Sequence, residues 1–278
     1  YLYLNPDKLS QMGSESKKLS GKNFDSNKNS NSLLKVYENL LIKKSPFECF
    51  KNRYNDFRLK VQEKRKIAHV CLSCNFYDQF GYQENKLVKK HLDSGHDVNV
   101  FTSTEMLTKH GSIKFVKPSS YISKDGCLVH RLPYAFDLHR KISTKIRAHK
   151  LLYKYLKSFS PDVIFFHGTC GWEVLTVRKY VLSHPKVELF IDSHEDHYNS
   201  ATNFLSRIIL HKLFYRSIIQ YSLPYVKSVL CVSVETISFV RKIYKIPESK
   251  IEFFPLGADL ICDQNYNSNR KNVRSELN

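Results

Sequence analysis

Glycine and long apolar runs are both scarce in this sequence of 278 residues. Only 9 glycines are present, and none of them form G-x-G-x-x-G, which disfavours a nicotinamide-dependent Rossmann enzyme. No apolar stretch reaches the roughly 18 residues that a membrane-spanning helix needs, and no signal peptide is recognisable. We therefore expect a folded protein in which nothing spans a membrane.

A regular cysteine framework is also absent. The 7 cysteines are an odd number, and several lie inside apolar runs, as buried thiols do. This pattern predicts a reducing compartment and a cytoplasmic location. Cys71 and Cys74 have the C-x-x-C spacing, but a zinc site would need a second pair of ligands and a redox site a thiolate of low pKa. A structural role is favoured, because Cys71 lies in an apolar run and no second C-x-x-C exists.

Positive charge, in contrast, is abundant: 44 Lys and Arg against 26 Asp and Glu give a net charge of +18. This balance indicates nucleic acid, an anionic membrane or a phosphorylated substrate as a neighbour, or else a solvated basic surface. Residues 140–157 are rich in Lys and Arg without any acid, and predict one amphipathic helix packed on a sheet. Peripheral contact of this helix with the inner face of a membrane is a secondary hypothesis. Nucleic acid is least favoured, because no basic stripe is interleaved with exposed aromatic residues.

Three regions differ in composition. Residues 1–65 predict an N-terminal extension, partly disordered and partly helical, because residues 10–32 are dominated by Ser, Asn, Lys and Gly. Residues 66–260 alternate short β-branched runs with amphipathic helical patterns, which predicts a single α/β domain. Residues 261–278 are expected to be a linker and the truncated start of a further domain.

The fold expected for residues 66–260 is a Rossmann-like parallel sheet of about seven strands with helices on both faces. The predicted strands are Ile67–Leu72, Val98–Phe101, Cys127–Leu132, Val163–Phe166, Val187–Ile191, Ser228–Val232 and Ile251–Phe254. The helical patterns between them include Glu84–Ser94, Arg140–Lys157 and Trp172–Ser183. In such a sheet the ligand crevice lies beyond the carboxyl ends of the strands, so the loops that follow the strands hold the candidate site.

Gly81 stands in the loop after the first predicted strand, directly before a helical pattern. The N–H groups and partial positive charge of a helix N-terminus suit a diphosphate, and a glycine lets the backbone approach closely. An ordinary strand-to-helix turn is the alternative, because one glycine is weak support.

Histidines and acids gather after two later strands. His167 directly follows Val163–Phe166 and precedes a glycine, at the predicted crevice. The segment Asp192–Ser200 follows Val187–Ile191 and concentrates acids, histidines and amides. It contains neither H-E-x-x-H nor D-x-D, so a metal site is less favoured there than a site for sugar hydroxyls, which carboxylates and amides bind in pairs.

Taken in order, these loops resemble glycosyltransferase family 4. Gly81–Asn85 with Ser94–Val100 is similar to the first βαβ unit of the family, and Pro161–His167 is similar to the strand that delivers its active-site histidine. Asp192–Ser200 looks like a segment of polysaccharide-biosynthesis members. Ile246–Ile251 with Pro255–Asp259 resembles the exit into the second domain. The resemblance covers about residues 66–260 and leaves residues 1–65 outside.

The resemblance implies a GT-B architecture, two Rossmann-like domains facing each other across a cleft, with this chain as the N-terminal, acceptor-side half. It also implies transfer of a sugar from a nucleotide-sugar donor to a glycan or lipid-linked acceptor, with retention at the anomeric carbon. This transfer would be metal-independent and would use no cofactor. By the same resemblance His167 would contact the donor sugar, and Gly81 would lie near the diphosphate. The acceptor would face Glu84, Asp192, His194 and Asn199.

Two features depart from the family pattern. Phe80 stands where the family often has the first of two glycines. The family's cationic pair and donor-binding acids belong to the second domain, whose opening Arg274–Leu277 resembles, so this polypeptide alone is expected to be catalytically deficient. The competing hypothesis is a non-enzymatic basic module that binds anionic membranes or other polyanions.

Overall fold

The structure is a computed structural model that describes residues 14–15, 64–74, 76–78, 81–108, 112–136, 139–256 and 263–276. Nearly all of the predicted extension, residues 1–65, lies outside the described residues. A compact unit begins at Lys64 and contains every strand described below.

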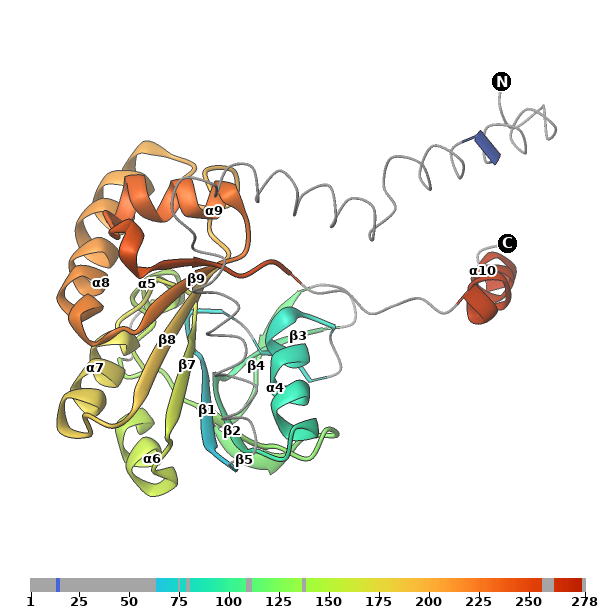
Figure 1. The fold of residues 1–278 in the computed structure, drawn as a ribbon, viewed down its shortest axis with the longest axis horizontal. Coiled ribbons are helices and arrows are strands. Elements are labelled where there is room, and N and C mark those ends of the chain that lie inside the picture. The colour runs from blue at the N-terminus through green and yellow to red at the C-terminus, as the bar shows by residue number, and fades with distance from the viewer. Residues whose placement is uncertain are drawn as a thin grey trace, which may run out of the picture. The chain divides into compact units, whose positions relative to one another are not determined.

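A sheet of eight strands forms the centre of this unit (Figure 1). The strand order is β10-β9-β8-β7-β1-β2-β6-β5, and every neighbouring pair is parallel except β5 and β6. The strands are β1 (Lys66–Cys71), β2 (Asp97–Ser103), β5 (Ser119–Ile122), β6 (Leu128–Leu132), β7 (Val163–His167), β8 (Glu188–Ser193), β9 (Ser228–Cys231) and β10 (Ile251–Phe253). All seven predicted strands are present, so the predicted Rossmann-like parallel sheet is confirmed.

Three short strands were not predicted. β5 extends the sheet as an antiparallel edge strand, and β3 (Glu105–Leu107) pairs with β4 (Ile113–Phe115) in a separate antiparallel ribbon. All three residues of β4 and three of the four residues of β5 are exposed. Strands of three or four residues with little buried surface lack the alternating apolar pattern by which a strand is recognised in a sequence.

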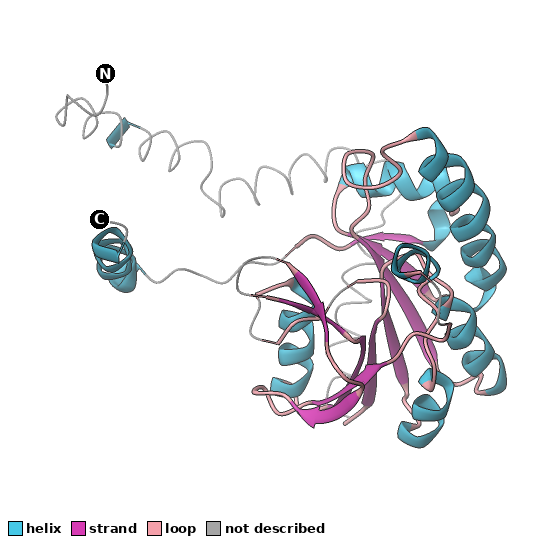
Figure 2. Cartoon of the chain, turned by 180° about the vertical axis from the view of Figure 1, so that it is seen from behind, coloured by secondary structure: helices cyan, strands magenta, loops and turns pink. Residues whose placement is uncertain are grey.

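Helices cover both faces of the sheet (Figure 2). They are α4 (Gln83–Asp93), α5 (Arg140–Ile146), α6 (Leu152–Phe159), α7 (Glu173–Ser183), the π-helical segment η1 (Ser206–Tyr215), α8 (Arg216–Ser222), α9 (Val234–Phe239) and the π-helical segment η3 (Val240–Tyr244), with the short 3₁₀ turns η2 (Leu223–Tyr225) and η4 (Glu248–Lys250), and α10 (Asp263–Glu276) near the end of the chain. None of the described helices is long and apolar enough to cross a membrane.

The two faces have separate cores because the side chains of a strand alternate. Val70 of β1 and Phe166 of β7 belong to the larger core, which includes residues of α6, α7 and α8. Cys71 of β1 and Val163 of β7 belong to the smaller core, which includes Val88 of α4. Both cores are built from β-branched and aromatic side chains in the runs that predicted the strands.

The prediction of one helix over residues 140–157 is wrong, because the chain breaks between α5 and α6. Arg147 and Leu151 adopt left-handed backbone conformations, with φ of 55° and 75°. Neither residue is a glycine, so the break comes from tertiary contacts rather than from local preference. The buried Glu173 carboxylate accepts a hydrogen bond of 2.7 Å from the N–H of His149, and the N–H of Trp172 donates to the carbonyl of Ile146.

Candidate functional site

The candidate site lies where β1 and β7 are neighbours in the sheet, with β2 beyond β1 and β8 beyond β7. Open α/β sheets bind ligands at such a switch point, beyond the carboxyl ends of the strands. The loops after β1 and β7 pack closely there, since a Cβ atom on Gly168 would lie 2.9 Å from Cβ of Ser73. The end of β8 joins them, because Oδ1 of Asp192 accepts a hydrogen bond of 2.8 Å from the N–H of Gly168.

His167 and Asp192 form the centre of the site. They are register partners at the ends of β7 and β8, and neither side chain has any exposed surface. Burial alone would lower the pKa of His167, but the Asp192 carboxylate outweighs it and raises the pKa to about 9. Burial acts against the Asp192 carboxylate as well, but His167 and His194 hold its pKa well below the ordinary value. The pair is therefore an imidazolium and a carboxylate at neutral pH.

A chain of histidines runs from this pair across β1 to α4. Nε2 of His167 lies 2.9 Å from Nδ1 of His69, and Nε2 of His69 lies 2.9 Å from Nδ1 of His91. Burial, followed by the charge of His167, lowers the pKa of His69, and burial lowers the pKa of His91 to about 4. Both are neutral at neutral pH, so the direction of the chain is fixed: His167 donates to His69, and His69 donates to His91.

His69 was not predicted as a site residue, although its position offered a signal. It stands in the middle of an apolar strand and is completely buried. A polar side chain at such a position needs a hydrogen-bonding partner. The partner could not be named from the sequence, because His167 is 98 residues away along the chain.

His194 and Glu84 stand beside the central pair. Nε2 of His194 lies 3.7 Å from Oδ2 of Asp192, too far for a hydrogen bond, and the side chain is 34% exposed. Burial lowers the pKa of His194, but Asp192 and Glu84 raise it above the ordinary value. Glu84 is buried in the first turn of α4 and also acts on His167 electrostatically. The structure thus brings together four of the predicted site residues, namely Glu84, His167, Asp192 and His194.

Gly81 and Asn199, the remaining predicted site residues, lie at the exposed surface. Gly81 precedes α4 in a conformation that needs no glycine, and an added Cβ atom would meet nothing closer than 3.9 Å. Asn199 shapes its own loop, donating from Nδ2 to the carbonyl of His194 and accepting at Oδ1 from the N–H of Asp196. Its amide is occupied by the backbone of the 192–200 turn.

The C-x-x-C pair borders the site. Cys71 is buried in β1, and Cys74 follows in the loop. A hydrogen bond with Cys71, burial and the nearby acids raise the pKa of the Cys74 thiol well above the ordinary value. A raised pKa is the opposite of what a reactive thiolate or a zinc ligand needs. Within the described part of the chain, no cluster of three His, Cys, Asp or Glu side chains is placed to hold a metal ion.

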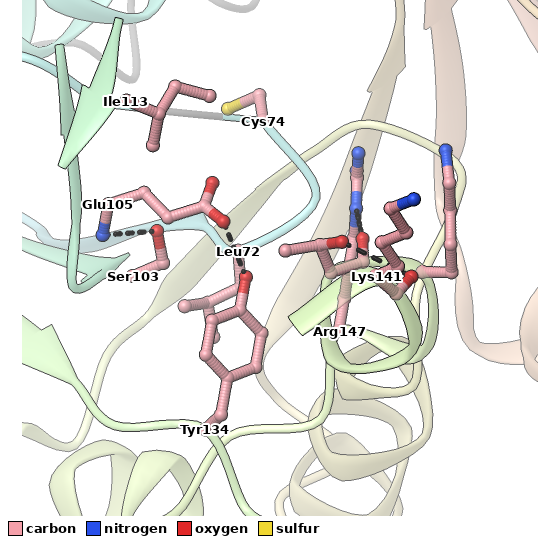
Figure 3. Close-up of a pocket in the computed structure, with 10 residues that line it drawn as sticks. Leu72, Cys74, Ser103, Glu105, Ile113, Tyr134, Lys141 and Arg147 are labelled. Carbon is pink, nitrogen blue, oxygen red and sulfur yellow. Dashed lines mark hydrogen bonds between the residues drawn. The ribbon is translucent and has the colours of Figure 1, made fainter. Parts of the chain in front are cut away.

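A pocket of about 480 Å³ opens next to the site (Figure 3). We call it the α5 pocket, since α5 and the following Arg147 supply one wall. Its lining residues are Leu72, Cys74, Ser103, Glu105, Ile113, Tyr134, Lys141, Thr144, Lys145 and Arg147. They come from the carboxyl ends of β1, β2 and β6, from β3 and β4, and from the basic segment that was predicted as part of a longer helix. The volume of the α5 pocket lies within the usual range for pockets that bind small molecules.

The chain has a mostly parallel, Rossmann-like sheet, with polar residues gathered at the switch point. The family model of Glycosyltransferase Family 4 matches residues 86–261. The chain therefore belongs to glycosyltransferase family 4. No protein of curated function matches it.

Solved structures that resemble the chain include a glycosyltransferase from Rickettsia africae ESF-5, with 13% identity over 76% of this chain and 50% of that chain and a TM-score of 0.44. A UDP-N-acetylglucosamine 2-epimerase has 12% identity, covering 69% of this chain and 48% of the other, with a TM-score of 0.40. The apo form of the lipopolysaccharide outer core galactosyltransferase WaaB has 12% identity over 70% of this chain and 47% of that chain, with a TM-score of 0.40. The chain thus spans about half the length of these proteins.

Proposed function

We propose that this chain is the acceptor-side half of a retaining glycosyltransferase, which transfers a sugar from a nucleotide-sugar donor to a glycan or lipid-linked acceptor without a metal or other cofactor. The main support is the meeting of Glu84, His167, Asp192 and His194 at the switch point of a family 4 domain. Transfer would need a second, donor-binding domain.

In the proposed reaction the bond between the anomeric carbon and the leaving phosphate oxygen breaks, and a bond from an acceptor oxygen forms on the same face of the sugar. The acceptor proton passes to the departing phosphate, so no enzyme nucleophile is required. Negative charge develops on the leaving diphosphate, and fixed donors and cations stabilise it. The N-terminus of α4 next to Gly81 would supply backbone N–H groups.

His167 would stabilise the transition state as a buried cation. Both of its ring nitrogens are used, one by Asp192 and one by His69. A direct contact with the donor sugar would therefore require the ring to give up the hydrogen bond to His69. His194 and Glu84 would face the acceptor, because Nε2 of His194 has no hydrogen-bonding partner among the described residues. Asp192 would act through both histidines, and Asn199 would hold the loop in shape.

The test is a transfer assay on an enzyme in which this chain is joined to its donor-binding domain, with a panel of nucleotide sugars. His167→Ala should lower kcat by at least about 100-fold, the usual effect of removing a group that stabilises developing charge. His139→Asn is the matched control, since His139 is exposed and caps α5 through its side chain, a role that Asn also fills. Wild-type activity of His167→Ala would remove His167 from the proposed role.

A second candidate is peripheral binding to an anionic membrane, with or without transferase activity. It is supported by η1 and the residues before it, where apolar side chains are strongly exposed: Phe204, Leu205, Ile209 and Leu213 are 54–79% exposed. Leu205, Ile209 and Leu213 follow one another at intervals of four residues, about one helical turn, so they lie on one side of this segment. Arg207, Lys212 and Arg216 lie on the same segment, and basic helices with exposed apolar side chains bind anionic lipid surfaces.

Vesicle co-sedimentation tests this second candidate. Binding to vesicles with anionic lipid should exceed binding to neutral vesicles and should fall with salt, because part of the attraction is screened. The double substitution Ile209→Ser, Leu213→Ser should weaken it at least several-fold. Equal recovery of both proteins with anionic vesicles would end this candidate, while binding to nucleic acid in place of vesicles would favour the polyanion module.

A further inference from the structure

The α5 pocket has an uneven distribution of charge. Lys141, Lys145 and Arg147 line it, against a single acid, Glu105. Lys141 and Lys145 are one helical turn apart on α5 and therefore project from the same face. Glu105 lies on the opposite side of the pocket from Lys141 and Arg147 (Figure 3). The pocket therefore has a cationic wall and an acidic wall.

Arg147 makes its side-chain hydrogen bonds to neutral groups among the described residues. Its guanidinium donates 3.0 Å to Sγ of Cys170 and 3.2 Å to the carbonyl of Thr144. Burial raises the pKa of the Cys170 thiol to about 11 in spite of Arg147, so the thiol is neutral at neutral pH. Glu195 acts on Arg147 electrostatically, but its carboxylate accepts from the hydroxyl of Thr169. Among the described residues, no carboxylate lies within ion-pair distance of this guanidinium.

Lys141 and Lys145, the two lysines of the α5 pocket, resemble Arg147 in this respect. Within the described ranges, neither Lys141 nor Lys145 has a carboxylate within ion-pair distance. The backbone that carries them is firmly held, because the Tyr215 hydroxyl donates 2.5 Å to the carbonyl of Lys145 and the N–H of Trp172 donates to the carbonyl of Ile146. Three cations on a fixed turn, one of them half-buried, form a site that an anion would complete.

The acidic wall has a different function. Glu105 is buried, and its Oε1 accepts 3.1 Å from the hydroxyl of Tyr134. Arg131 donates to the carbonyl of Glu105 rather than to its carboxylate. A carboxylate held in this way can accept hydrogen bonds from the hydroxyl groups of a sugar, while it would repel an anion placed beside it. The two walls together suit a molecule with hydroxyls at one end and a negative charge at the other.

We propose that the α5 pocket binds an anionic sugar unit of the acceptor, with its phosphate or carboxylate group on Lys141, Lys145 and Arg147 and its hydroxyls toward Glu105. This rests on the proposed function of the chain as the acceptor-side domain. The acceptor would therefore be an acidic glycan or a sugar phosphate rather than a neutral sugar. The pocket would thereby select the acceptor by charge, at a distance from the bond that is formed.

The experiment is an NMR titration of the 278-residue chain with four probes: glucose 1-phosphate, glucuronate, neutral methyl glucoside and uridine diphosphate. Glucose 1-phosphate or glucuronate should bind saturably and shift the amide resonances of residues 141–147. Methyl glucoside should bind at least tenfold more weakly. The double substitution Lys141→Ala, Lys145→Ala should weaken binding of the anionic sugars by roughly tenfold or more, as expected when charge-assisted contacts are removed.

The double substitution Lys154→Ala, Lys157→Ala is the matched control. It removes the same charge from exposed positions of α6, outside the pocket, so binding should stay within about twofold of wild type, since only long-range screened charge is lost. Equal weakening by both double substitutions would show non-specific attraction to a basic protein and overturn the proposal. Methyl glucoside binding as tightly as the anionic sugars would also overturn it, as would the absence of binding by either anionic sugar.

The uridine diphosphate arm separates the two sources of an anion. If uridine diphosphate binds in the α5 pocket and displaces glucose 1-phosphate at lower concentration, the pocket belongs to the donor and the acceptor assignment is wrong. The outcome is independent of the transfer assay described above. An enzyme that transfers to neutral acceptors would retain the proposed function and lose this inference, whereas a chain that binds anionic sugars without transferring anything would do the reverse.

Discussion

Nδ1 of His167 lies 2.5 Å from Oδ2 of Asp192, and both side chains are completely buried. An ion pair removed from water is stabilising only when its remaining donors and acceptors are also satisfied. The N–H of Gly168 and the ring of His69 meet this condition. The pair therefore links β7, β8 and β1 at the edge where the candidate site lies.

Asp192→Asn should change how stability depends on pH. The pKa of His167 is raised to about 9 in the folded protein, so its contribution is complete below the unfolded value of about 6.5 and is lost as the pH rises toward 9. Without the carboxylate, burial dominates and this contribution disappears. Urea unfolding at pH 6, 7.5 and 9 should show a smaller difference between pH 6 and 9 for Asp192→Asn than for wild type, by on the order of 1–3 kcal/mol.

Asp93→Asn is the control for this measurement, because it removes the same charge from an exposed pair with Lys89. Exposed pairs contribute little, so its pH profile should follow that of wild type. If Asp192→Asn also follows wild type, the His167 imidazolium is not stabilised as described.

His69→Phe should leave the Nε2–H group of His167 buried without an acceptor. We expect the free energy of unfolding to fall by about 1–3 kcal/mol and the pKa of His167, followed by NMR of its ring protons, to decrease. His69→Asn should recover part of both effects, because an amide oxygen can take the place of Nδ1. A loss of stability without a change in the pKa of His167 would mean that His69 only fills space.

Gly168→Ala should be costly, whereas Gly81→Ala should not. Gly168 has φ of +95°, and an added Cβ atom would come within 2.9 Å of Ser73. The strain and the displaced loop should lower stability by about 1–3 kcal/mol. Gly81 has no such constraint, so Gly81→Ala should leave urea unfolding unchanged. Any effect of Gly81→Ala on donor KM would then report on the proposed diphosphate contact alone.

Glu173→Ala should loosen the turn between α5 and α6. The Glu173 carboxylate is the acceptor for the N–H of His149, and its loss leaves that buried donor without a partner, at a cost of about 1–3 kcal/mol. Amide hydrogen exchange should show faster exchange for residues 147–151 in this variant. Glu248→Ala, which removes an exposed carboxylate, should exchange like wild type. Unchanged protection in Glu173→Ala would mean that other contacts hold the turn.

The strands could be predicted because each is a run of apolar side chains long enough to show its pattern, as in β1 and β7. The order of loops along a parallel sheet then predicts that His167 and Asp192 lie at one edge of it. What local sequence could not show was the partner of a polar residue far away in the chain. His69 and Arg147 were missed for that reason, since their roles depend on His167 and Cys170.

The break between α5 and α6 could not be predicted either. Arg147 and Leu151 have ordinary helical preferences, and no glycine or proline stands between them. Tertiary hydrogen bonds from the start of α7 impose the turn. The charges of this basic segment divide between the α5 pocket and the outer surface of α6 instead of forming one stripe.

The division of this segment separates two kinds of evolutionary constraint. α6 contributes Leu152 and Leu156 to the larger core, so substitutions there affect whether the domain folds. α5 lies beyond the turn and contributes Lys141 and Lys145 to the pocket. Lys141 and Lys145 could therefore diverge among related chains, altering which molecules the domain accepts, while the scaffold beneath them stays the same.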